Sequence, residues 1–163
     1  MRRTIVLIAI VVACVAAAQA QTNYSTYTNV RFVYSIAYPT DIFTEGDESD
    51  NGDGKVFRSD DGAELRVWGE HNALSRSLRE EFKAAVDESG GGVTYKKQAA
   101  SWFVVSGVRD GKIFYRRTLR RKSGSTDTFY TFTIEYPSGA RNRYDTIVKR
   151  IADSFRFDPS ADV

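Results

Sequence analysis

The chain has 163 residues, with 23 lysines and arginines against 21 aspartates and glutamates, one histidine and one cysteine. This near balance of charge excludes a strongly basic nucleic-acid-binding protein, which needs a net or clustered positive field. One histidine and one cysteine exclude a metal site built from several imidazoles or thiolates. A chain of this length is expected to fold as one domain with a sizeable core.

Residues 1–20 are typical of a signal peptide. Arg2 and Arg3 precede an apolar run, and Ala18-Gln19-Ala20 has the small-x-small pattern that signal peptidase cleaves. The apolar run is shorter than the about 20 residues that span a membrane. We therefore expect an exported protein, periplasmic or extracellular, with no membrane span after processing.

Two alternatives concern the same segment. It could be an uncleaved anchor, or Val11-Val12-Ala13-Cys14 could act as a lipobox that leaves a lipid-anchored Cys14. Against the lipobox, residues 15–18 remain apolar where a mature lipoprotein usually becomes polar. Cleavage after Ala20 would remove the only cysteine and two arginines, which leaves a chain of net charge near zero without disulfides.

The first part of the expected mature chain predicts a leader and three strands. Residues 21–29 are polar and predict a leader, and residues 30–39 alternate as in a strand that Pro39 ends. An acidic loop, 41–50, follows. The segments "KVFRS" and "AELRVWGE" then predict two short strands joined by the turn Asp60-Asp61-Gly62.

The middle of the chain predicts one helix and a run of antiparallel strands. Ser77 and Glu80 form a capping-box pattern before a helix over 77–88, which the glycines at 90–92 end. Four strands follow, "VTYKKQ", "SWFVVSGVRD", "GKIFYRRTLRR" and "TFYTFTIEYP". The connections between them are short, so neighbouring strands must be antiparallel.

A second amphipathic helix is predicted from Ala140 to Phe155, before a polar tail at 158–163. The pattern indicates an α+β domain over residues 30–157, with a mostly antiparallel sheet. Phe103 and Val105 alternate with Trp102 and Val104, so both faces of this strand are apolar. We therefore expect a helix–sheet–helix sandwich.

Several segments together carry a family resemblance: "FVYSIAYPTDIF", "NGDGKVFRSDDGAELRVWG", "WFVVSGVRDGKIFYRR", "FTIEYP" and "YDTIVKRIADSF". They resemble small exported bacterial proteins of unassigned function that have the PsbP-like fold, over about residues 28–157. The fold is named after the extrinsic P-protein of photosystem II, and a eukaryotic Ran-binding factor shares it. The resemblance implies a non-catalytic binding or assembly module and supplies no catalytic residue.

Residues 49–60 contain a degraded calcium-loop pattern. With Gly54 at the sixth position, oxygen-bearing side chains fall at positions 1, 3, 5 and 12, which are Ser49, Asn51, Asp53 and Asp60. Serine and aspartate replace the preferred aspartate and glutamate at the two ends of the loop. The competing interpretation is a tight turn that starts the "KVFRS" strand. Calcium is the only cofactor that the sequence suggests.

The strongest charge feature is a run of basic residues on one predicted strand, formed by Arg116, Arg117, Arg120, Arg121 and Lys122. On a strand the arginines divide between the two faces, so they do not form one stripe. Either they discourage unwanted strand pairing, or they form an anion-binding or partner-binding surface for an acidic protein, a lipid headgroup or a wall polymer. The expected partner is an unidentified envelope protein.

The remaining candidates are aromatic or titratable residues. His71 is expected in an exposed loop, although a hydrolase that uses it as a base is an alternative. Ser106-Gly107 indicates a bulge or close packing. Trp68 and Trp102 belong either to the core or to the wall of a ligand pocket.

The sequence thus predicts a non-enzymatic protein-binding or assembly module of the bacterial envelope. A small-ligand or calcium-binding protein is the alternative, followed by a hydrolase. The number of subunits is left open.

Overall fold

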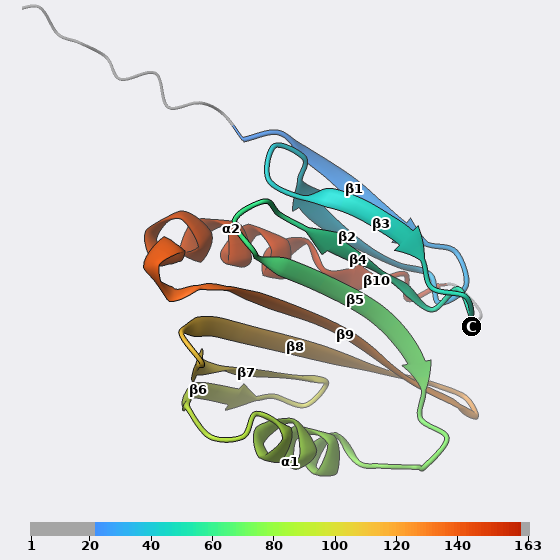
Figure 1. The fold of residues 1–163 in the computed structure, drawn as a ribbon. Coiled ribbons are helices and arrows are strands. Elements are labelled where there is room, and N and C mark those ends of the chain that lie inside the picture. Colours follow the sequence, from blue (N-terminus) through green and yellow to red (C-terminus); the bar gives the residue numbers. More distant parts are fainter. Residues whose placement is uncertain (1–21, 161–163) are drawn as a thin grey trace, which may run out of the picture.

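The computed structural model describes residues 22–160 (Figure 1). The predicted signal peptide and the Cys14 lipobox lie outside the described residues.

The described chain forms strands and helices in the order β1 (Tyr24–Asn29), β2 (Tyr34–Pro39), β3 (Thr44–Glu48), β4 (Gly54–Arg58), β5 (Glu64–His71), α1 (Leu78–Glu88), β6 (Val93–Gln98), β7 (Trp102–Arg109), β8 (Lys112–Ser123), β9 (Thr126–Pro137), α2 (Arg141–Ser154) and β10 (Arg156–Phe157). A short 3-10 helix, Ser138–Ala140, leads into α2.

The strands form two sheets. The large sheet has seven strands in the order β3-β4-β5-β9-β8-β7-β6, and the small sheet has three in the order β1-β2-β10. All pairings between neighbouring strands are antiparallel. β3 and β6 are therefore the two edges of the large sheet (Figure 1).

α1 packs against one face of the large sheet. Its first turn is held by the predicted capping box, in which Ser77 Oγ accepts from the Glu80 N–H and the Glu80 carboxylate accepts from the Ser77 N–H. The side chains buried between α1 and the sheet are Leu78, Ala85, Phe103, Val105, Phe114 and Phe129.

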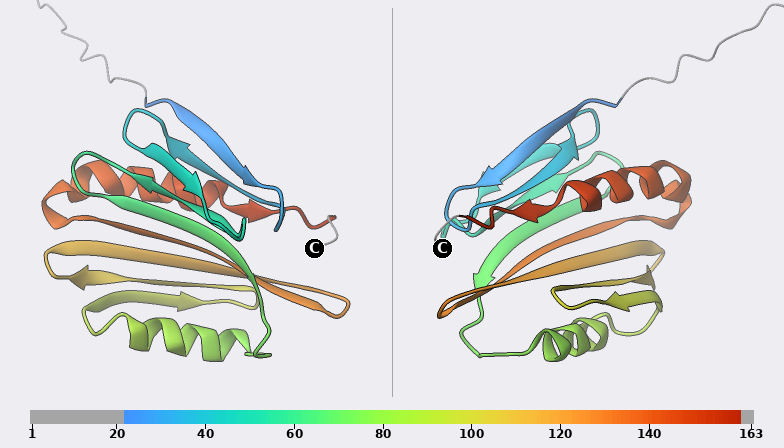
Figure 2. Two further views of the ribbon diagram at one scale, coloured as in Figure 1. Left: turned by 45° about the vertical axis from the view of Figure 1, so that its right-hand side comes forward. Right: turned by 180° about the vertical axis from the view of Figure 1, so that it is seen from behind.

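The opposite face is covered by α2 and the small sheet together. α2 lies against β2 and β9, and Tyr34, Phe132 and Ile151 are fully buried in this larger core (Figure 2). The predicted α+β class with a mostly antiparallel sheet is confirmed. The predicted sandwich of one sheet between two helices is incomplete, because a second sheet shares the covering with α2.

The predicted leader and acidic loop contain two strands. The polar segment 21–29 includes β1, which pairs with β2 and buries Tyr27 and Asn29. Asn29 is tolerated inside because its side-chain amide donates to Tyr27 Oη and to the Gly52 carbonyl. β3 is an acidic edge strand, and its composition favours a loop when it is read without its neighbours.

A close approach of two glycines fixes the start of β6 on β7. A Cβ atom on Gly107 would lie 2.1 Å from the Gly92 carbonyl oxygen, and Gly92 has a φ of +71°. The ladder between β6 and β7 is irregular between Val93 and Tyr95. The prediction of a bulge or close packing at Ser106-Gly107 is confirmed.

Candidate functional site

The predicted basic run lies on β8 and divides between the two faces of the large sheet. Arg116 and Arg120 lie on the α1 face with Phe114, and Arg117 lies on the α2 face. The run therefore forms no continuous basic patch.

Arg116 is engaged by acidic side chains of α1. Its guanidinium lies 3.0 Å from a carboxylate oxygen of Glu81 and 3.0 Å from one of Glu88. Glu81 is buried and also pairs with Arg76 at 3.1 Å. Arg116 thus holds α1 to the sheet, and its charge is neutralised within the protein.

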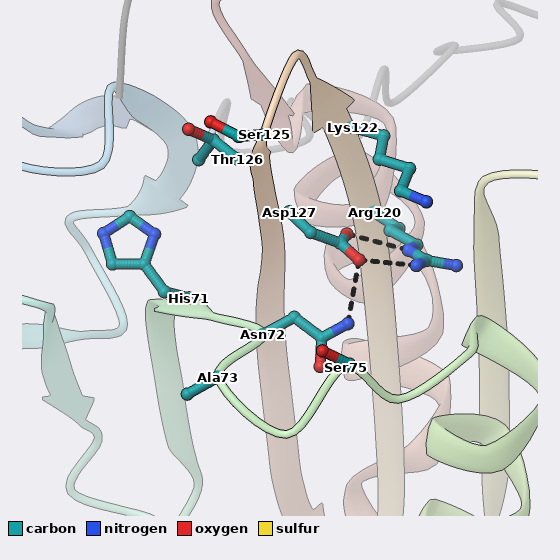
Figure 3. A pocket seen from close by; sticks show the side chains of 9 residues that line it. All are labelled: His71, Asn72, Ala73, Ser75, Arg120, Lys122, Ser125, Thr126 and Asp127. Atoms are coloured by element: carbon teal, nitrogen blue, oxygen red, sulfur yellow. Dashed lines mark hydrogen bonds and ion pairs between the residues drawn. The ribbon is translucent and has the colours of Figure 1, made fainter.

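Arg120 forms a two-point ion pair across the β8–β9 hairpin. Its Nε and Nη2 donate to the two oxygens of Asp127 at 2.9 and 2.5 Å, and Asn72 Nδ2 donates to the same carboxylate at 2.8 Å (Figure 3). The hydrogen bonds from Arg120 lower the pKa of Asp127 and raise that of Arg120. The hydrogen bond from Asn72 ties the β5–α1 loop to the hairpin.

A shallow polar cleft of about 610 Å³ lies beside this pair. Its lining residues are His71, Asn72, Ala73, Ser75, Arg120, Lys122, Ser125, Thr126 and Asp127 (Figure 3). The carboxylate of Asp127 already occupies the guanidinium of Arg120, so the cleft does not offer Arg120 to an incoming anion.

His71 is exposed, as expected, but it is the last residue of strand β5, paired with Thr128, and not a loop residue. Its ring lies 5.0 Å from the Phe32 ring, and Nδ1 lies 3.4 Å from Thr128 Oγ1. Within residues 22–160 no serine is hydrogen-bonded to this imidazole, so the structure assembles no serine–histidine pair there.

The predicted calcium ligands lie in two different turns. Ser49 Oγ donates to Asp53 Oδ1 at 2.6 Å, and Asn51 Nδ2 donates to Asp53 Oδ2 at 2.8 Å, in the turn before β4. Asp60 lies in the turn after β4, at the opposite end of that strand. The segment 49–60 is therefore a turn, a strand and a second turn. In the described part of the chain, no group of three His, Cys, Asp or Glu residues is placed to hold a metal ion.

A different surface lies where β6, β7 and β8 extend beyond α2. The pairings place Tyr95, Ser106 and Tyr115 in one row across these strands, and Lys97, Val104 and Arg117 in the next. Both rows lie on the α2 face, while α2 itself lies over β9 and the small sheet (Figure 2). We call this surface the open sheet face, and it comprises Tyr95, Lys97, Trp102, Ser106, Val108, Tyr115 and Arg117; Val104, in the same rows, is buried.

The open sheet face combines exposed apolar groups with aromatic rings. Tyr95 is 52% exposed and Val108 is 43% exposed, two of the few large hydrophobic residues that the described chain leaves in solvent. Trp102 and Tyr115 are half-buried at the edge of the larger core. Burial raises the pKa of the Tyr115 hydroxyl, and Arg117 opposes that rise.

Two cations flank these rings. Lys97 Nζ lies 5.7 Å and the Arg117 guanidinium carbon 5.4 Å from the centre of the Trp102 ring. Neither cation forms a salt bridge with a described residue. Arg117 donates to the Ala152 carbonyl at 3.0 Å, while its buried Nε has no hydrogen-bond partner among residues 22–160.

The sequence named Arg117 and Trp102 but missed Tyr95, Lys97, Val108 and Tyr115 as one surface. The alternation of Tyr95 with Lys97, and of Tyr115 with Arg117, places each pair on one face of its strand. The sequence does not show that α2 stops short of that face. Trp68, the other candidate for a pocket wall, lies on the α1 face of the large sheet. The centre of its ring lies 6.0 Å from the guanidinium carbon of Arg116.

The sequence matches no protein-family model, and no curated protein matches it. The structure does match solved structures. The solution structure of cyanobacterial PsbP from Synechocystis has a TM-score of 0.59 and 15% identity, and the match covers 86% of this chain and 96% of that one. The fold is PsbP-like.

Two further matches support this assignment. The Ran-binding protein Mog1p of Saccharomyces cerevisiae has a TM-score of 0.51 and 11% identity, over 84% of this chain and 96% of that one. A crystal structure from Bacteroides thetaiotaomicron gives the same score and identity over 84% of this chain and 49% of that one. The resemblance stated from the sequence is confirmed for the fold. No helix among residues 22–160 is long and apolar enough to cross a membrane.

Proposed function

We propose that the protein is a non-enzymatic protein-binding module of the bacterial envelope, and that it binds its partner through the open sheet face. The observation that carries this proposal is the exposure of Tyr95 and Val108 on the same sheet face as Trp102 and as two cations that lack salt bridges to described residues. Aromatic side chains and arginine are enriched in protein interfaces, whereas a monomer rarely leaves them together in solvent.

The similar structures favour the same class of function. One of them, Mog1p, is a Ran-binding protein, and it shares the fold at 11% identity. Because a shared fold alone does not determine function, this similarity supports protein binding only as a class and identifies no partner.

The proposal changes which basic residues form the interface. Of the five named from the sequence, Arg117 belongs to the open sheet face. Arg116 and Arg120 are engaged by carboxylates, Arg121 donates to the Pro159 carbonyl, and Lys122 lines the polar cleft. Location in the envelope is part of the proposal and rests on the signal-peptide pattern of residues 1–20.

A capture experiment tests the proposal. Tagged protein is incubated with an envelope extract, and the retained proteins are compared for wild type, for a variant with Tyr95→Ala and Lys97→Glu, and for Arg79→Glu. Arg79 is an exposed α1 residue without an ion pair to the described chain, so it controls for charge reversal away from the open sheet face.

We expect a partner that wild type and Arg79→Glu retain equally and that the double variant retains about tenfold less, the loss typical of truncating an interface anchor. If the double variant retains as much of the partner as wild type does, the open sheet face is not the interface. Recovery of no protein would contradict stable protein binding.

A further inference from the structure

The edge of the large sheet next to the open sheet face is exposed. β6 pairs with β7 on one side only, and each residue from Thr94 to Gln98 is exposed. No described strand lies on its outer side (Figure 1). An edge strand presents free backbone groups to any extended segment that approaches it.

The direction of these backbone groups follows from the ladder. The Ala99 N–H donates to the Trp102 carbonyl at 2.8 Å, so Ala99 directs its backbone groups toward β7. Because this direction alternates along an antiparallel strand, Lys97 and Tyr95 also point inward, and Gln98 and Lys96 point outward. The outward groups form a short row that a further strand can pair with.

Two consecutive lysines determine which strand would fit. Lys97 lies on the open sheet face, and Lys96, one residue before it, lies on the α1 face. Neither forms a salt bridge with a described residue. A second copy of β6 in the same position would bring like charges together on both faces, which disfavours self-association through this edge. An acidic strand would instead place a carboxylate beside each lysine.

Resting on the proposed function, we infer that β6 accepts an extended acidic segment of the partner as an eighth strand of the large sheet. Backbone hydrogen bonds to Lys96 and Gln98 supply affinity, as in other complexes formed by strand addition. Carboxylates beside Lys96 and Lys97 select an acidic sequence, and side chains on the α2 side contact Tyr95.

The test uses a displayed library of random ten-residue peptides, selected on the full chain. We expect the selected peptides to be rich in strand-forming residues alternating with Asp or Glu. Binding of a selected peptide is then compared for Lys96→Pro and Lys96→Ala. Both variants remove the charge of Lys96, but only proline also removes the outward backbone N–H. We expect proline to weaken binding about tenfold more than alanine, because the peptide carbonyl loses its donor.

A second measurement does not depend on the proline variant folding. In the wild-type protein, the amide protons of Lys96 and Gln98 are expected to exchange at least about tenfold more slowly when a selected peptide is bound. Equal effects of proline and alanine together with unchanged exchange, or a library that yields no acidic binder, would overturn strand addition. If the selected peptides no longer bind Trp102→Ala but still bind Lys96→Pro, strand addition is overturned. The open sheet face would then remain as a protein-binding surface.

Discussion

The Arg117 guanidinium lies 5.4 Å from the centre of the Trp102 ring and donates to the Ala152 carbonyl on α2. This contact joins the end of α2 to the first residue of β7, at the boundary between the larger core and the open sheet face. The tryptophan therefore has two roles: it packs against the larger core, and its ring lies near both Arg117 and Lys97.

Trp102→Ala tests the packing role. We expect the free energy of unfolding to fall by about 2 kcal/mol, less than for a fully buried tryptophan because Trp102 is partly exposed. Urea denaturation measures this change, with Lys97→Ala as a control that should cost at most about 0.5 kcal/mol. Equal costs for the two variants would show that the ring is not packed against the core.

Glu81→Gln tests the contact between α1 and the sheet. Glu81 is buried between Arg116 and Arg76, so its neutral form leaves two cations without their principal partner. We expect a loss of about 2 kcal/mol of stability. Glu88→Gln removes the more exposed partner of Arg116 and should cost about 0.5 kcal/mol or less. A smaller loss for Glu81→Gln than for Glu88→Gln would contradict this account.

The Arg120–Asp127 pair predicts a pH dependence. Its hydrogen bonds lower the pKa of Asp127 below its ordinary value of 3.8, so the pair stabilises the fold while Asp127 is ionised. This contribution is complete above the ordinary pKa and is lost as the pH falls through the lowered pKa. Asp127→Asn should thus cost about 1 kcal/mol at neutral pH and little in strong acid.

Urea denaturation of the wild type and Asp127→Asn at pH values on both sides of this transition measures the difference. A difference that stays constant with pH would show that the carboxylate does not derive its stabilising effect from Arg120.

Most of the large sheet and both helices could be predicted from the sequence, because their patterns are local. The Ser77 and Glu80 capping box and the short turns between β6 and β9 fix neighbouring elements directly. β1, β3 and β10 could not be predicted in this way. β1 is polar and is half-buried only by contacts with distant segments, such as the packing of Tyr27 on Tyr34 and Phe57. β3 is an acidic edge, and β10 has two residues.

The candidate site followed the same division. The alternation of Arg116 and Arg117 between two faces is a local property and was predicted, as the structure confirms. Glu81 and Glu88 neutralise Arg116 because α1 crosses the sheet at that point. No local sequence pattern predicts where α1 crosses the sheet. The exposure of Tyr95 likewise depends on how far α2 reaches.

The turn before β4 predicts a weak or absent response to calcium. The side chains of Ser49, Asn51 and Asp53 already hydrogen-bond one another, and Asp60 lies at the other end of β4. We expect the same unfolding midpoint in about 1 mM calcium, the range of weak extracellular calcium modules, and in chelator. A midpoint that rises with calcium in the wild type but not in Asp53→Asn would contradict this expectation.

The central claim is that a partner protein covers the open sheet face, and crosslinking from that face in the living cell tests it most directly. A photo-reactive phenylalanine analogue is placed at Tyr95, and as a control at Arg79 on the exposed side of α1. The account predicts a light-dependent adduct with one protein from position 95 and none from position 79. No adduct from position 95, or the same adducts from both positions, would contradict it.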